Sequence, residues 1–221
     1  MTRVRHLVLL RHGQTQSNAD NRMQGQLDTE LSVLGHSQAV TTAEILSVRQ
    51  PLVIYSSDLH RALDTAEELA KRCGLSVNSH KDLRETRLGE WQGMTHREVD
   101  AAYPGQRQAW RDSPRWAPPG GESRIDVADR SVPVVEHVFD NEPEWGADGC
   151  ERPVVLVAHG GLISALTAAL LDLPVDNWPV LGGMGNASWT QLSAHGDGGF
   201  ADLRWRLDVW NASAQVSNDV L

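Results

Sequence analysis

Short apolar runs alternate with longer amphipathic stretches along most of the chain. Residues 8–10, 52–55 and 154–158 are continuous apolar runs of strand length, and each ends at polar residues. Runs of this kind are typical of strands that are buried on both faces of a sheet. Further strands are expected at 75–77, 189–192 and 203–210.

Helices are expected at 32–48, 61–72, 123–138 and 162–171. Ser32 is a good N-cap residue for the first of them, and Ser123 opens a variant of the capping box. Gly74 should end the second, because glycine readily adopts the left-handed conformation found at helix C-termini. The order of strands and helices predicts an α/β fold, a three-layer sandwich whose mostly parallel central sheet is flanked by helices.

Residues 86–122 interrupt this pattern. They contain Trp91, Trp110 and Trp116, several charged residues and a Pro-Pro-Gly-Gly break. We interpret this segment as a cap or insertion over the active face of a single domain that spans residues 1–221. Outside the cap, Trp189, Trp205 and Trp210 are expected to be packing residues.

Composition supports one ordinary globular domain, since the 221 residues are 40% hydrophobic and 22% charged. The apolar run at residues 7–10 is too short for a secretion signal, and none reaches the roughly 18 residues that span a bilayer. We therefore expect a soluble, cytoplasmic protein with no membrane partner. Cys73 and Cys150 lie on unrelated segments, which supports neither a disulfide framework nor a zinc knuckle.

The net charge of −9 argues against nucleic acid as a partner, because such proteins need a broad basic surface. A small anionic substrate remains compatible with this charge, because only the local field in its pocket matters.

Histidine next to glycine follows two of the predicted strands, as Arg11-His12-Gly13 and as His159-Gly160-Gly161. Ligands bind at the carboxyl ends of strands in open α/β sheets, and glycine lets a ligand approach the backbone. Either histidine alone would more often be structural. Two such pairs, one with an adjacent arginine, favour a functional site.

Arg61 lies in the first turn of a predicted helix, where a cation opposes the helix dipole. An anion bound there would explain the placement, because a guanidinium and N-terminal amides hold phosphate together. The alternative is a solvated surface arginine.

Glu85 precedes an aromatic, glycine-broken loop, and it is equally compatible with a proton donor and with a salt-bridging residue. Two histidines and a glutamate also raise the question of a metal. The chain lacks the H-x-x-E-H and H-E-x-x-H spacings, and nearby arginines would repel a cation, so we expect neither a metal nor a cofactor.

Together these elements resemble the histidine phosphatase superfamily, also called phosphoglycerate mutase-like. The resemblance implies a small phosphorylated substrate and a phosphohistidine intermediate on His12. It further implies that Arg11, Arg61 and His159 hold the phosphoryl group and that Glu85 protonates the leaving oxygen.

Residues 22–28, 177–189 and 205–211 resemble a bacterial branch of this superfamily that hydrolyses a glucosylated 3-phosphoglycerate. Its product, glucosylglycerate, is a precursor of methylglucose lipopolysaccharides. The resemblance implies a homodimer. It further implies that Asn18 and Gln24 contact the phosphate and the substrate. Apart from the resemblance, we assign Gly160, Arg22 and Arg87 as candidate substrate contacts.

Three other functions stay open at this point. A cofactor-dependent phosphoglycerate mutase shares the nucleophile but returns the phosphoryl group to substrate, and it carries a longer insertion than this chain has. A broad-specificity phosphatase would accept many small phosphoesters. A catalytically inactive scaffold would usually have lost one of the site residues, and all of them are present.

Overall fold

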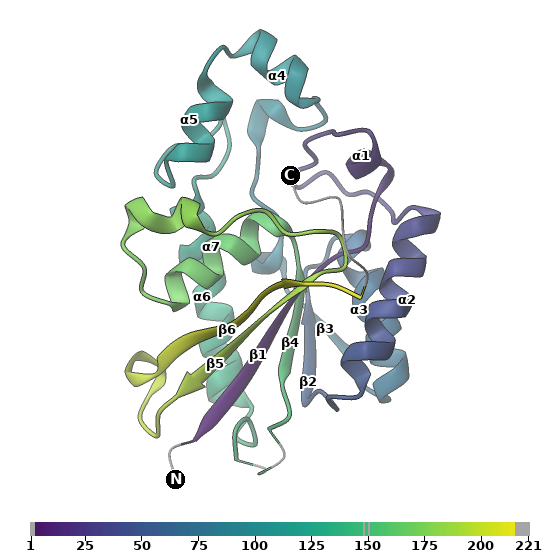
Figure 1. Cartoon of the computed structure of the whole chain (residues 1–221), viewed down its shortest axis with the longest axis vertical. Coiled ribbons are helices and arrows are strands. Elements are labelled where there is room, and N and C mark those ends of the chain that lie inside the picture. The colour runs from purple at the N-terminus through teal and green to yellow at the C-terminus, as the bar shows by residue number, and fades with distance from the viewer. Residues whose placement is uncertain (1–2, 148, 150, 215–221) are drawn as a thin grey trace.

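The computed structural model describes residues 3–147, 149 and 151–214, so Cys150 lies outside the described residues. Its centre is a six-stranded sheet with the strand order β3-β2-β4-β1-β5-β6 (Figure 1). The strands are β1 (Val4–Arg11), β2 (Val53–Ser56), β3 (Val77–Ser79), β4 (Val154–Ala158), β5 (Trp189–His195) and β6 (Arg204–Ala212).

The sheet is mostly parallel, as the sequence predicts. Strands β3, β2, β4 and β1 are parallel to one another, whereas β5 pairs antiparallel with β1 and β6 pairs antiparallel with β5. The carboxyl ends of β1, β2 and β4 therefore lie at one edge of the sheet.

Successive side chains of a strand point to opposite faces of the sheet, so the buried strands contribute to two hydrophobic cores, one on each face. Leu7 and Leu9 face the core on one side of the sheet, and Val8 and Leu10 face the core on the other. Helices α6 (Arg124–Asn141) and α7 (Gly160–Leu170) cover the first side, and α2 (Val33–Ser47) and α3 (His60–Cys73) cover the second (Figure 1). This arrangement confirms the predicted three layers.

Local capping chemistry fixes the helix ends. The hydroxyl of Ser32 accepts from the amide of Gly35, and Ser123 forms a full capping box with Asp126. Gly74 ends α3 in the left-handed conformation, with φ +67°.

Most boundaries differ from the predicted ones by a few residues: β1 and β5 are longer than predicted, and α6 ends at Asn141 rather than at residue 138. Two further differences have a local explanation. The third strand begins at Val77 because the amide of Leu75 is still bonded to the carbonyl of Ala70 at the end of α3. Helix α7 begins at Gly160 rather than at residue 162, and His159 is its N-cap residue. The start of α7 is therefore not shifted towards its C-terminus by Gly160 and Gly161, because the later residues of the helix pack on the sheet.

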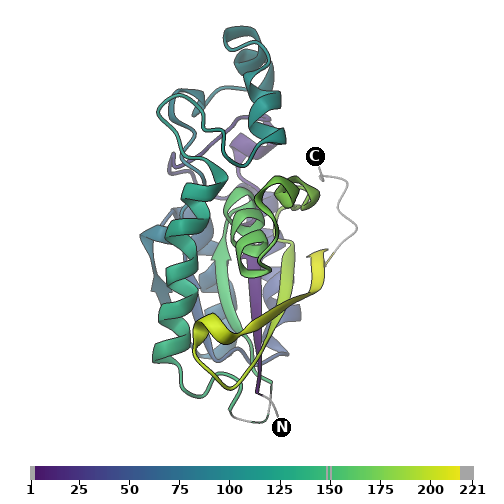
Figure 2. The same ribbon diagram turned by 90° about the vertical axis from the view of Figure 1, so that its left-hand side faces the viewer.

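Residues 86–122 lie beyond the carboxyl edge of the parallel strands (Figure 2). They include η2 (Gly89–Trp91), α4 (His96–Ala102) and α5 (Gln106–Asp112). Trp91 is fully buried in this cap, where its ring stacks on Trp116 and lies edge-on to Trp110. The remaining short helices are α1 (Gln16–Ala19), η1 (Lys81–Leu83), η3 (Val175–Val180) and η4 (Phe200–Asp202).

The tryptophans outside the cap pack as predicted. Trp189 is 7% exposed in one core cluster, and Trp205 and Trp210 are partly buried against the other. Among the described residues, no helix combines the length and apolar character needed to cross a membrane.

Candidate active site

The register of β1 and β4 brings the two histidines together. Arg11 pairs with Ala158 at the last position of both strands, and the amide of His12 donates to the carbonyl of Ala158 at 3.0 Å. The centroids of the His12 and His159 rings are 5.1 Å apart, and both side chains are buried.

One hydrogen bond fixes the tautomer of His12. Its Nδ1 lies 2.7 Å from the carbonyl oxygen of Gly13, and a carbonyl can only accept, so Nδ1 carries the proton. Burial, followed by the charges of Arg61 and Arg11, lowers the pKa of His12 well below its usual range. The imidazole is therefore neutral at cellular pH, with the lone pair on Nε2.

His159 lies behind His12 at the N-terminus of α7. Burial and the charge of Arg61 lower the pKa of His159 well below its usual range. Within the described part of the chain neither of its ring nitrogens has a hydrogen-bond partner. A buried, unsatisfied imidazole is costly, which is typical of a group that bonds to a ligand.

Arg61 is 1% exposed, so it is not the solvated surface residue of the alternative interpretation. Its guanidinium donates to the carbonyls of Leu27 at 2.7 Å and Gly25 at 2.8 Å. Burial lowers the pKa of Arg61 to about 10, with Glu85 and Asp28 acting in the opposite direction, so the group remains charged at neutral pH.

Glu85 is held by backbone amides rather than by arginines. Its carboxylate accepts from Thr86 at 2.7 Å, from Leu162 at 3.0 Å and from Gly161 at 3.1 Å. The last two amides belong to the first turn of α7, whose N–H groups have no partner within the helix. A Cβ at Gly161 would lie 2.6 Å from Oε1 of Glu85, so only glycine leaves room for this contact.

Arg11 reaches across the end of β1 and donates from Nη1 to the carbonyl of Met184. The same loop holds the backbone of His12, since the amide of Ala187 and the side chain of Asn186 both donate to the His12 carbonyl. Sequence reasoning assigned no function to this loop.

These side chains surround a small cavity of about 130 Å³. Its walls are formed by Arg11, His12, Asn18, Gln24, Gly25, Arg61, Glu85, Thr86, Leu88, Trp110 and Gly161. The side-chain amide of Asn186 donates to Oδ1 of Asn18 at 3.2 Å, and the hydroxyl of Thr29 donates to Oε1 of Gln24 at 2.6 Å. The predicted residues of the phosphate site thus converge on one hollow, with His159 behind it.

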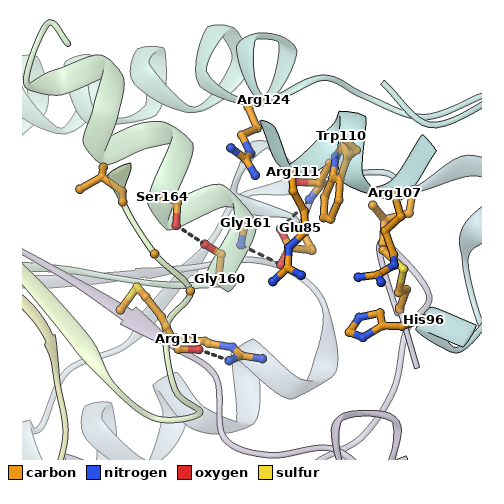
Figure 3. A pocket seen from close by; sticks show the side chains of 17 residues that line it. Arg11, Glu85, His96, Arg107, Trp110, Arg111, Arg124, Gly160, Gly161 and Ser164 are labelled. Atoms are coloured by element: carbon orange, nitrogen blue, oxygen red, sulfur yellow. Dashed lines mark hydrogen bonds between the residues drawn. The ribbon is translucent and has the colours of Figure 1, made fainter. Parts of the chain in front are cut away.

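A second cavity of about 330 Å³ shares several lining residues with the first, among them Arg11, Glu85 and Gly161. Figure 3 shows the side chains that line this second cavity. Gly160 lies in its wall, and the cap contributes His96, Arg107, Trp110 and Arg111, with Arg124 from the start of α6.

Sequence reasoning had not identified Arg107, Arg111 and Arg124 as residues of the site. The spacing of Arg107 and Arg111, one helical turn apart beside Trp110, is the signal that was available.

Arg22 and Arg87 do not line either cavity. Arg22 donates to the carbonyl of Gly93 and lies 3.6 Å from Glu98, and Arg87 is exposed. The structure therefore separates these two predicted substrate contacts from the others. In the described ranges, no three histidine, cysteine or acidic side chains come together as a metal site.

The sequence profile of the histidine phosphatase superfamily (branch 1) matches residues 7–212. The chain is 70% identical to the glucosyl-3-phosphoglycerate phosphatase of Mycolicibacterium vanbaalenii over 99% of this chain and 100% of that protein. It is 66% identical to the enzyme of the same name from Mycobacterium tuberculosis, with the same coverage.

The solved structures similar to this chain include the mycobacterial glucosyl-3-phosphoglycerate phosphatase in complex with VO3. The TM-score is 0.92 at 66% identity, over 95% of this chain and 100% of that one.

Proposed function

The chain belongs to the histidine phosphatase superfamily (branch 1), and we propose that it hydrolyses glucosyl-3-phosphoglycerate to glucosylglycerate and phosphate. The observation that carries this proposal is the 130 Å³ cavity in which a neutral His12, two guanidiniums and the Glu85 carboxyl converge. The identity of 70% to an enzyme of that name supports the substrate.

His12 is the nucleophile of the proposed reaction. Its Nδ1 proton is held by the carbonyl of Gly13, so Nε2 is free to attack phosphorus in line with the leaving oxygen. The N–P bond forms as the P–O ester bond breaks. Arg11, Arg61 and His159 stabilise the charge on the non-bridging oxygens in the transition state, as a metal ion does in other phosphoryl transfers.

Glu85 supplies the proton that the leaving group needs. An alkoxide is a poor leaving group, and general acid help is typically worth roughly 10²- to 10⁴-fold in rate. The resulting carboxylate then removes a proton from water, which attacks the phosphohistidine and releases inorganic phosphate. Asn18 and Gln24 complete the wall around the phosphoryl group.

The outer cavity fits the non-phosphate part of this substrate. Arg107 is engaged by Asp100 at 2.6 Å, whereas Arg111 and Arg124 face the same space close enough for their charges to interact. Partial burial, followed by the charge of Arg111, lowers the pKa of Arg124, and Asp112 acts in the opposite direction. A carboxylate could pair with these two arginines, and the ring of Trp110 in the same cavity offers a surface for a sugar ring.

Three further expectations come from the sequence and from its resemblance to the family. The chain would form a single domain whose cap is residues 86–122, it would assemble as a homodimer, and it would act in the cytoplasm. Its product would then enter the synthesis of methylglucose lipopolysaccharides. Light scattering of the purified protein tests the homodimer directly.

The test of the function compares kcat/KM for glucosyl-3-phosphoglycerate, 3-phosphoglycerate and simple sugar phosphates, with and without a chelator. We expect the glucosyl ester to be the best substrate and the chelator to have no effect. Equal values for all substrates would favour a broad-specificity phosphatase. Conversion of 3-phosphoglycerate to its isomer without release of phosphate would favour the mutase.

A further inference from the structure

Arg130 on α6 is a half-buried arginine that lines neither cavity of the site, yet each of its three nitrogens donates a hydrogen bond. Nη1 donates to the carbonyl of Asp82 at 2.8 Å, and Nη2 donates to the carbonyl of Glu85 at 3.0 Å. The guanidinium therefore holds both ends of the short segment that leads into Glu85.

The main chain and the side chain of Glu85 are thus fixed from two different helices. Arg130 of α6 holds its carbonyl, while the first turn of α7 holds its carboxylate through Gly161 and Leu162. The side chain of Gln26 also donates to the Glu85 carbonyl, at 3.1 Å.

Glu122 locks the guanidinium in this orientation. Its carboxylate accepts from Nε at 3.0 Å and from Nη2 at 3.1 Å, and the two side chains are only 17% and 16% exposed. The same carboxylate accepts from the amide of Arg87 at 2.8 Å. Such a forked pair depends on the planar geometry of arginine, which lysine cannot reproduce.

The pair also joins Glu85 to the neck of the cap, which we define as residues 86–89 and 119–122. The two segments of the neck pack closely against each other. A Cβ added at Gly89 would lie only 2.0 Å from the carbonyl oxygen of Pro119. The backbone amide of Glu122 also donates a hydrogen bond to the carbonyl of Arg87 at 2.8 Å. A shift of the neck would therefore be transmitted through Glu122 and Arg130 to the backbone of Glu85.

We propose that Arg130, held by Glu122, is a positioning residue that sets the carboxyl of Glu85 for proton donation to the leaving oxygen. This inference rests on the function proposed above, in which Glu85 is the general acid. Arg130 itself touches neither the substrate nor the reacting atoms.

The test measures how strongly the loss of kcat/KM in a variant depends on the leaving group of the substrate. The enzyme variant Arg130→Lys is compared with the unaltered protein on 3-phosphoglycerate, whose alkoxide needs a proton, and on p-nitrophenyl phosphate, whose aryl oxide departs without one. The parameter is kcat/KM, because it reports the first transfer and not the phosphohistidine hydrolysis common to both substrates.

We expect Arg130→Lys to lower kcat/KM on 3-phosphoglycerate by about tenfold, a part of the roughly 10²- to 10⁴-fold worth of general acid help. On p-nitrophenyl phosphate the loss should be under about threefold. Glu85→Gln serves as the reference and should show the same selectivity more strongly.

Arg152→Lys is the matched control. Arg152 also donates to two carbonyls, those of Gln50 and Pro51, but it does so at the amino end of the sheet. Its replacement should affect both substrates equally. If Arg130→Lys lowers the unfolding temperature, Glu122→Gln repeats the test, because it keeps the side-chain size and removes the ion pair.

The outcomes separate the two proposals. Equal losses on both substrates in Arg130→Lys and Glu122→Gln, with selectivity retained in Glu85→Gln, would overturn the role of Arg130 and leave the proposed function standing. An absence of selectivity in Glu85→Gln would overturn the acid role of Glu85 and the inference with it.

Discussion

Three neighbours of His12 set the tautomer and the pKa that the proposed nucleophile needs. The carbonyl of Gly13 fixes its tautomer, and the charges of Arg61 and Arg11 add to burial in lowering its pKa. The same cations that would hold the phosphoryl group thus keep the attacking nitrogen unprotonated. Residue identity alone pointed to the histidine and the arginines, but not to this division of tasks.

The low pKa values of His12 and His159 predict how stability depends on pH. In the unfolded chain both imidazoles return to their ordinary pKa of 6.5. Below that pH the unfolded state binds protons that the folded state excludes, so the free energy of unfolding should fall as the pH is lowered. Replacing His159 by Gln should make this fall shallower.

Urea unfolding at about pH 7.5 and 5.5 measures the effect. His36→Gln, at an exposed histidine of α2, is the control and should leave the pH dependence unchanged. A dependence that is the same in His159→Gln and in the unaltered protein would show that burial does not exclude protons from this site.

At the scale of elements, the first turn of α7 fixes the carboxylate of Glu85 through two backbone amides. Gly161→Ala should lower kcat/KM on 3-phosphoglycerate by roughly 10²-fold, because the added Cβ occupies the space of the carboxylate. Gly160→Ala should have a small effect, since its Cβ would lie 3.6 Å from Arg11. Comparable losses in the two variants would contradict this assignment.

The start of α3 offers a second element to test. Asp28 accepts from the amide of His60 at 2.9 Å and so caps the helix, while the loop it belongs to holds Arg61 through its carbonyls. Asp28→Ala should cost about 1 kcal/mol of stability and weaken inhibition by inorganic phosphate severalfold. Asp28→Asn keeps a hydrogen-bond acceptor and should have a milder effect. Unchanged inhibition by phosphate in Asp28→Ala would show that capping of α3 by Asp28 does not affect phosphate binding.

Element boundaries show what sequence patterns can and cannot reveal. Ser32, Gly74 and Ser123 mark helix ends through bonds with near neighbours in the chain, so their signals are readable in advance. The contact between Glu85 and the amides of α7 joins residues far apart in sequence. Sequence reasoning therefore left open whether Glu85 was a proton donor or a salt-bridging residue.

At the scale of the whole molecule, an acidic chain with a net charge of −9 places a cationic cavity between its cap and its sheet. The composition predicted a cap over the active face, but it could not show which side chains of the cap face the cavity. This is why Arg22 and Arg87 were predicted as substrate contacts while Arg111 and Arg124, which face the cavity, were missed.

Those two arginines should recognise the carboxylate of the substrate. Arg111→Gln and Arg124→Gln are each expected to lower kcat/KM about tenfold on 3-phosphoglycerate, and much less on glycerol 3-phosphate, which lacks the carboxylate. Arg115→Gln is the matched control, since Arg115 is a cap arginine outside both cavities. Equal losses on the two substrates would exclude a carboxylate contact.

The most direct measurement is the location of the phosphoryl group in the enzyme during turnover. The protein is mixed with substrate, quenched at alkaline pH within the first turnover, digested and analysed by mass spectrometry. The account predicts one phosphoryl group on the Nε2 of His12, and none in His12→Ala. Full activity without any phosphorylated residue, or a phosphoryl group on His159, would contradict it.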